Sequence, residues 1–183
     1  MAVIVKGFFA GVEFLSPMHN RARIVPGPGQ ESVWDYPRPP RIERVEQPLR
    51  VEHGGRLIAA APGGWRILET SHPPVYYLGA ETVEAGVLRP NDRTSFCEFK
   101  GVAHYWDIVE GARVVVADAG WSYPLPAMPY AALKDHVAFY AGRVDACFVG
   151  DERVVPQPGD FYGGWITAAI VGPFKGGAGT RGW

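Results

Sequence analysis

Short runs of β-branched and aromatic residues, separated by glycine-containing turns, recur along this chain from Leu49 to Val149. The clearest pair is Leu49–His53 and Arg56–Ala60, joined by Gly54 and Gly55. Two strand-like runs joined by a two-residue glycine turn are typical of a β-hairpin. The recurrence of such pairs constrains the fold more than any other feature, because it requires antiparallel strands to pair along most of the chain.

Further segments extend this pattern. We expect strands over 65–70, 74–78 and 83–88, and hairpins formed by 102–109 with 113–118 and by 136–140 with 144–149. Only Tyr130–Asp135 favours a short helix. The sequence therefore predicts an all-β or β-rich fold of antiparallel sheets, with at most one or two short helices.

Two flanking regions differ from this central part. Residues 26–48 contain six prolines, which remove amide donors and favour extended geometry, so we expect an arm lying on a surface. Residues 159–183 contain eight glycines together with large apolar side chains such as Trp165 and Phe174, which predicts a tail that docks on its own domain or on a second subunit. We divide the chain into an N-terminal extension (1–30), a β-rich domain that includes the arm (31–150) and a glycine/aromatic tail (151–183).

Charge and cysteine content narrow the possible partners. The 183 residues carry a formal net charge of -1. The chain therefore lacks the strong positive field that attracts nucleic acids and anionic membranes. We expect a small-molecule partner, no nucleic acid and no membrane, and we leave a homodimer open. Cys97 and Cys147 are the only cysteines, which predicts free thiols and a cytoplasmic protein rather than a disulfide framework.

The stretch from Thr94 to Trp106 is the densest in chemically capable side chains. Cys97 is a candidate nucleophile if Lys100, His72 or His104 favours its thiolate, and the alternative is a small buried apolar side chain. The Lys100 ammonium is a candidate anion contact, beside a glycine that lets backbone approach closely, and the alternative is a solvated lysine. The candidate catalytic residues are therefore Cys97, Lys100 and His72.

Metal and cofactor motifs are weak. The chain has no Cys-x-x-Cys and no His-x-x-x-His spacing, and Lys100 stands where a zinc knuckle would place its second cysteine, so we predict no metal site. Residues 177–182 match the dinucleotide glycine pattern, but the chain ends one residue later without the helix that receives the pyrophosphate. We therefore predict no cofactor.

A group of aromatic residues next to polar ones predicts a small-molecule pocket, because aromatic rings with polar tips commonly line such sites. Many aromatic residues also fill β cores, so we select those beside histidine, lysine, arginine or cysteine. The predicted ligand-binding residues are Trp34, Arg38, His72, Tyr76, Cys97, Lys100, Tyr105 and Trp121.

With these residues in place, the chain resembles the DUF427 family of small bacterial proteins, which have no established activity. The resemblance rests on residues 31–41 (ESVWDYPRPPR), 69–77 (ETSHPPVYY), 95–103 (SFCEFKGVA), Tyr105 with Trp106, 120–124 (GWSYP), 133–140 (LKDHVAFY), and the tail segments 161–166 and 172–183. It covers about Glu31 to Trp183.

The resemblance implies a β-tent-like fold, in which two antiparallel sheets meet at an angle with a pocket between them. Zinc-bearing relatives of this fold pin the sheets with paired cysteine knuckles, and here Cys97 and Lys100 occupy the knuckle position without the metal. The family is also catalogued as nucleotidyltransferase-like. This sequence lacks the Gly-Ser element and the spaced acidic pair that metal-dependent nucleotidyl transfer requires, so we do not carry that activity over.

Three functional hypotheses follow. In the first, the aromatic residues stack on a planar small molecule while Lys100 and Arg38 meet its anionic or polar group. In the second, the protein is an enzyme in which Cys97 attacks or is oxidised, using Lys100 or His72 to favour the thiolate. In the third, the tail is a structural or protein-interaction surface.

Overall fold

The computed structural model describes residues 23–183, and expectations for the first 22 residues lie outside that range. The described strands form sheets of seven, four, two and two strands, and all pairings are antiparallel except the short β1–β15 pair. The prediction of a strand-rich, antiparallel fold is confirmed. The elements are β1 (Glu31–Ser32), η1 (Val33–Asp35), β2 (Arg41–Val45), β3 (Leu49–His53), β4 (Arg56–Ala61), β5 (Gly64–Leu68), β6 (Val75–Gly79), η2 (Ala80–Thr82), β7 (Leu88–Cys97), β8 (Gly101–Glu110), β9 (Arg113–Ser122), η3 (Met128–Leu133), β10 (His136–Phe139), β11 (Ala146–Val149), β12 (Glu152–Arg153), β13 (Val155–Pro156), β14 (Trp165–Ile166) and β15 (Ile170–Val171).

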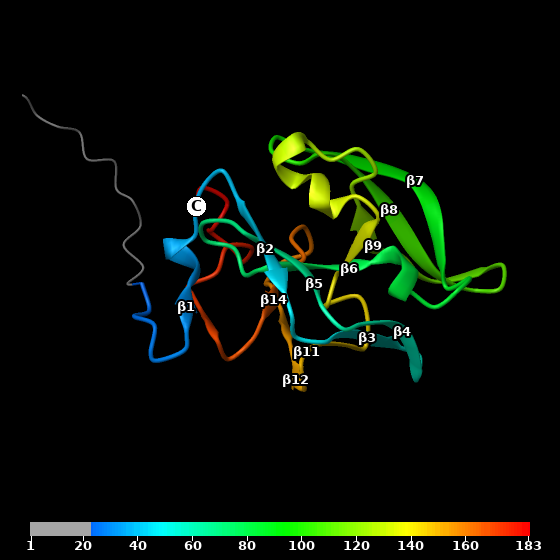
Figure 1. Ribbon diagram of the computed structural model, residues 1–183, viewed down its shortest axis with the longest axis horizontal. Helices are drawn as coiled ribbons and strands as arrows, with labels where there is room; N and C mark the ends of the chain where they lie inside the picture. The colour runs from blue at the N-terminus through cyan, green and yellow to red at the C-terminus, as the bar shows by residue number, and fades with distance from the viewer. Residues whose placement is uncertain (1–22) are drawn as a thin grey trace, which may run out of the picture.

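The seven-stranded sheet has the order β2-β5-β6-β10-β9-β8-β7 and curls into a half-barrel (Figure 1). The predicted β8–β9 hairpin is present in it, and β5 pairs with β6 as neighbours. In the four-stranded sheet, β3 pairs with β4 across Gly54 and Gly55, whose φ angles of 61° and 71° suit glycine. The predicted helix is the 3-10 helix η3, which begins and ends two residues earlier than expected.

The third predicted hairpin is wrong. β10 pairs with β6 and β9, whereas β11 pairs with β3 and β12, so the two strands belong to different sheets. The turn between them carries the chain from one sheet to the other. Phe139 and Val149 nevertheless lie in one core, which is why both segments show the same apolar pattern in the sequence.

Strand β7 was also missed. The expected strand at 83–88 is largely a loop that follows η2, and β7 begins only at Leu88. The sequence of β7 contains Pro90, which argues against a central strand. β7 lies at the edge of the seven-stranded sheet, where proline is tolerated.

The residues from Thr94 to Trp106 span the end of β7, a tight turn and the first half of β8. Cys97 pairs with Gly101 across the turn, and Gly101 has a φ of 97°, which a residue with a Cβ atom rarely adopts. Lys100 therefore occupies a turn between two paired strands, held in place by the strand register on both sides.

The two main sheets pack face to face over one apolar core. The core takes Tyr76, Leu78 and Phe139 from the seven-stranded sheet and Leu49 and Val51 from the four-stranded sheet. The other face of the seven-stranded sheet is buried as well, by a cluster made largely of aromatic side chains. That cluster comprises Ile67, Tyr77, Ala103, Tyr105, Trp121, Tyr123, Tyr130, Leu133, Ala138 and Tyr140.

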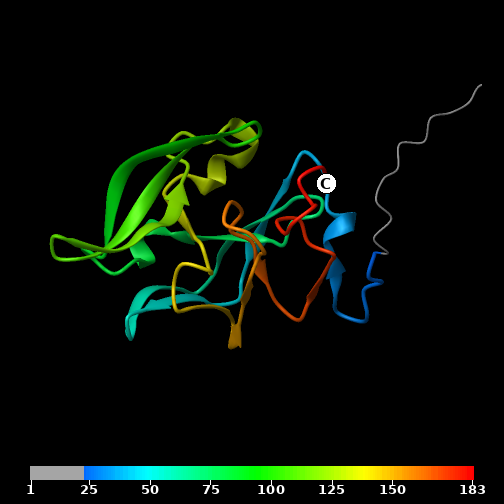
Figure 2. The same cartoon turned by 180° about the vertical axis from the view of Figure 1, so that it is seen from behind.

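The tail packs against the rest of the chain. Trp165 is fully buried in the core between the sheets, stacks on Tyr76 at 5.3 Å between ring centroids and donates a hydrogen bond from Nε1 to Phe139 O at 2.9 Å. β15 pairs with β1 of the arm. Figures 1 and 2 show the arm and the end of the tail side by side at one end of the molecule.

Candidate functional site

A cavity of about 400 Å³ opens on the aromatic face of the seven-stranded sheet, which faces away from the four-stranded sheet. Strands β5 to β9, the loop between β5 and β6, and the tail form its walls. This cavity does not lie between the two sheets, where the pocket was expected and where apolar side chains pack. A smaller hollow at the edge between the sheets contains only Tyr76 of the predicted ligand-binding residues.

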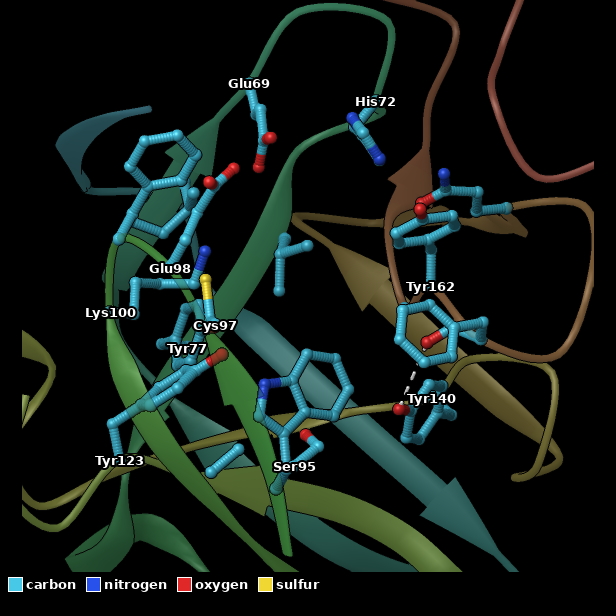
Figure 3. Close-up of a pocket in the computed structure, with 18 of the residues that line it drawn as sticks. Glu69, His72, Tyr77, Ser95, Cys97, Glu98, Lys100, Tyr123, Tyr140 and Tyr162 are labelled. Atoms are coloured by element: carbon cyan, nitrogen blue, oxygen red, sulfur yellow. Dashed lines mark hydrogen bonds between the residues drawn. The ribbon is translucent and has the colours of Figure 1, made fainter. Parts of the chain in front are cut away.

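The cavity brings together Arg38, His72, Cys97, Lys100, Tyr105 and Trp121 of the predicted residues. These come from the arm, the β5–β6 loop and three strands with their connecting turn, so the half-barrel curl gathers residues that are far apart in the sequence. Figure 3 shows Cys97 and Lys100 on one side of the cavity and His72 and Tyr162 on the other.

Trp34 and Tyr76 do not line this cavity. Trp34 packs against Trp183 with ring centroids 5.5 Å apart and donates a hydrogen bond from Nε1 to Pro173 O at 2.9 Å, so it joins the arm to the tail. Tyr76 points into the core between the sheets, because neighbouring residues of a strand face opposite sides. Tyr77, the next residue, is the one that lines the cavity.

Lys100 is buried, with 8% of its surface exposed. Its Nζ lies 6.0 Å from the ring centroids of both Tyr123 and Tyr130, and it has no ion pair or hydrogen bond with any other residue that the structure describes. Nζ is not one of the fully buried polar atoms, so the ammonium at the end of this largely buried side chain keeps access to the cavity. The Lys100 cation is therefore available to an anionic group in the cavity.

Two carboxylates at the rim are already paired. The Arg38 guanidinium contacts Glu98 at 2.6 Å and Glu69 at 3.5 Å. A second lysine of the cavity, Lys175, donates a hydrogen bond from Nζ to Trp183 O at 2.5 Å. Lys175 Nζ is thus hydrogen-bonded, whereas Lys100 Nζ has neither an ion pair nor a hydrogen bond among the described lining residues.

His72 is held by its backbone and by one ring nitrogen. Ser71, the preceding residue, has a φ of 68°, and the Ser71 N–H donates to Val33 O at 2.9 Å. His72 Nδ1 lies 2.9 Å from Thr70 O, and a carbonyl oxygen only accepts, so Nδ1 carries the proton. Burial lowers the pKa of His72 below its ordinary value, aided by Lys175 and Arg38 and opposed by the Thr70 carbonyl and Glu69. The ring is therefore neutral at pH 7, and Nε2 presents a lone pair.

The two cysteines occupy different surroundings. Cys97 is partly exposed and lines the cavity. Cys147 is buried in the core between the sheets, and burial raises the pKa of its thiol. Only Cys97 is therefore placed to meet a molecule in the cavity.

Several aromatic lining residues were missed from the sequence, among them Tyr77, Tyr123, Tyr140, Tyr162 and Phe161. Burial raises the pKa of the Tyr77, Tyr123 and Tyr140 hydroxyls, so they stay neutral. Alternate residues of a strand face the same side, so Tyr123 shares a face with Trp121 and Tyr140 shares a face with Ala138. Identifying one cavity-facing residue on each strand would therefore have identified the next one. The tail residues carried no comparable signal.

A family model described as a domain of unknown function, DUF427, matches residues 41–150. The chain belongs to the DUF427 family. No curated protein matches it. The matched part of this DUF427 protein includes Lys100, His72, Cys97 and most of the aromatic wall, whereas Arg38 precedes it and the tail residues of the cavity follow it.

Within residues 23–183 no group of three or more His, Cys, Asp or Glu side chains is arranged to hold a metal ion. Lys100 follows Cys97 on the β7–β8 turn, in the position where a zinc knuckle would supply a second thiolate. In the same range no helix is long and apolar enough to cross a membrane.

Proposed function

We propose that this DUF427 protein binds a small, planar, anionic molecule in the cavity on the aromatic face of its seven-stranded sheet. The observation that carries the proposal is Lys100, a largely buried residue whose ammonium has no anionic partner among the described residues and which lines the cavity. Natural proteins rarely bury a lysine in this way unless something pairs with it.

The walls support a planar body for the ligand. Trp121 and Tyr140 lie 4.5 Å apart between centroids, and Tyr77 and Tyr123 extend the same aromatic surface. Flat rings stack favourably on such surfaces, and pockets for small molecules combine mostly apolar walls with a few placed polar groups. The volume of about 400 Å³ lies within the range of such pockets.

The test compares an acid with its neutral isostere. We expect 2-naphthoate to bind more tightly than 2-naphthamide in isothermal titration calorimetry, by about tenfold to a hundredfold, the usual value of a hydrogen bond to a charged group. Lys100→Met removes this difference, whereas Lys134→Met, which changes an exposed lysine outside the cavity, preserves it.

Three results would overturn the proposal: no binding of either compound, equal binding of acid and amide, or an unchanged preference for the acid in Lys100→Met. The first and second would deny the anionic class of ligand. The third would move the anion contact away from Lys100.

An enzymatic use of Cys97 is a second candidate. Its partial exposure at the same corner of the cavity as Lys100 favours it, because an anionic substrate held by Lys100 would lie beside the thiol. The interaction role of the tail has less support, since Trp165 and Ile170 are buried within the chain itself. A homodimer remains a prediction, which a measurement of molecular mass in solution would test.

The cytoplasmic location expected from the cysteine content is also part of the proposal. Cys97 and Cys147 are both free thiols, which persist in reducing compartments. The expected absence of nucleic-acid and membrane partners rests on the near-zero net charge.

A further inference from the structure

His72 adds a second recognition point to the cavity, of a chemistry opposite to that of Lys100. The residue is 8% exposed, and its ring lies edge-on to Tyr162, with centroids 4.6 Å apart. Figure 3 shows the ring entering the cavity from the loop above it, across from Lys100 and Cys97. The two groups therefore face the cavity from opposite sides.

The orientation of the ring determines what His72 offers. Nδ1 donates a hydrogen bond to Thr70 O, so the remaining nitrogen, Nε2, is an acceptor in the neutral ring. Nε2 has no hydrogen-bond partner among the residues that the structure describes. Its lone pair is therefore free to accept a hydrogen bond from a donor on a bound molecule.

The loop restricts this ring. The positive φ of Ser71 costs free energy for a residue with a side chain, and the His72 N–H is bonded to Glu69 O at 3.0 Å. Pro73 and Pro74 follow directly and limit the backbone further. The tail contributes Tyr162 against the ring and Lys175, whose N–H donates to Ser71 O at 2.9 Å. Nε2 is therefore a positioned acceptor rather than one on a freely rotating side chain.

We infer that the ligand carries, opposite its anionic group, a hydroxyl or amino hydrogen that His72 Nε2 accepts, which makes it a hydroxyaryl or aminoaryl acid. This inference rests on the proposed function, since Lys100 binds the acid end. The aromatic walls hold the ring between the two polar ends. Such a two-ended arrangement uses the Lys100 cation on one side of the cavity and the His72 acceptor on the other, where the Lys175 ammonium is already bonded to Trp183 O.

The test measures the value of the hydroxyl hydrogen. Calorimetric titrations compare 6-hydroxy-2-naphthoate with 6-methoxy-2-naphthoate and with 2-naphthoate, and 3- and 4-hydroxybenzoate with benzoate, which covers shorter spans. We expect the best hydroxy acid to bind about threefold to tenfold more tightly than its unsubstituted and methoxy counterparts, the usual net value of one neutral hydrogen bond.

Two variants assign that advantage to His72. His72→Asn keeps a side-chain N–H for Thr70 O but lacks Nε2, and we expect it to lose the preference for the hydroxy acid. His72→Gln places an amide oxygen near the position of Nε2, and we expect it to recover part of the preference.

The outcomes separate the two proposals. If 2-naphthoate binds through Lys100 but no hydroxy acid gains over its parent, or if His72→Asn keeps the full gain, the inference is overturned and the proposed function stands. If no acid binds, or binding ignores Lys100, the proposed function is overturned and this inference with it. The comparison in the unmodified protein decides the matter even if a His72 variant fails to fold.

Discussion

Gly163 in the tail lies directly against the indole ring of Trp121 in β9: a Cβ atom added to Gly163 would lie 2.3 Å from Trp121 Cη2 and 2.6 Å from Cζ3. Trp121 in turn lies 4.5 Å from Tyr140 between ring centroids. The tail therefore touches the aromatic wall of the cavity at a point where no side chain fits.

Gly163→Ala should destabilise the protein by about 1–3 kcal/mol, because the added methyl group must displace a packed ring. It should also weaken the binding of 2-naphthoate, since Trp121 lines the cavity. The measurements are urea unfolding and calorimetric titration. Gly142→Ala is the control, since its Cβ would lie at an ordinary 3.6 Å from Pro156 Cβ. Equal stability of the two variants would contradict the close contact between tail and wall.

The two thiols should differ sharply in reactivity. In native protein we expect 5,5′-dithiobis(2-nitrobenzoate) to modify only Cys97, because burial both shields Cys147 and raises its pKa. Both thiols should react in denaturant. Cys97→Ser should abolish the native reaction, and a native reaction that persists in that variant would show that the core around Cys147 opens readily.

The same reagent probes Lys100, since it is an aromatic dianion. Lys100→Met should slow its reaction with Cys97 severalfold, because the cation that attracts the reagent is lost. The rate with neutral N-ethylmaleimide should change much less. Equal slowing of both reagents would contradict an electrostatic attraction of the dianion by Lys100.

His72 should make stability depend on pH. Its pKa is lowered in the folded protein, chiefly by burial, and is about 6.5 when unfolded, so the unfolded chain binds more protons between these values. Stability should therefore fall as the pH drops through 6.5, by at most about 1.4 kcal/mol per pH unit. Urea unfolding at pH 7.5 and 5.5 should show a larger acid loss for the unmodified protein than for His72→Gln. Parallel losses in the two would exclude the lowered pKa.

Trp165 should be essential to the fold. Trp165→Ala removes a fully buried ring and its hydrogen bond to Phe139 O, so we expect a loss of about 3–5 kcal/mol in the free energy of unfolding. Phe161→Ala, which changes a tail ring that is 67% exposed, should be nearly neutral. A mild effect of Trp165→Ala would indicate that the tail is dispensable and would restore the interaction hypothesis.

Much of the fold could be predicted from local signals. The β3–β4 and β8–β9 hairpins follow from glycine turns between strand-like runs, because both pairing and turn depend on neighbouring residues. The different partners of β10 and β11 could not be predicted in this way, since they depend on which distant strands have an edge free for pairing. β7 was missed because Pro90 is acceptable only at a sheet edge, and the sequence does not say which strand is the edge.

The choice between Tyr76 and Tyr77 illustrates the same limit in the site. Alternation requires them to face opposite sides of β6, but Tyr76 is 4% exposed and Tyr77 is 1% exposed, so both faces are buried. Neither polarity nor hydrophobicity then distinguishes the core face from the cavity face.

The antiparallel strand-rich class, the family, and the concentration of polar chemistry at Cys97, Lys100 and His72 all follow from the sequence, because turns, alternation and motifs are local properties of the chain. Tertiary structure decided that these residues share one cavity on the outer face of the curled sheet, and that Lys100 faces it unpaired. The physical reason is that burial and pairing depend on segments remote in sequence: the curl of the sheet, the path of the tail and the contacts of Arg38 with Glu69 and Glu98.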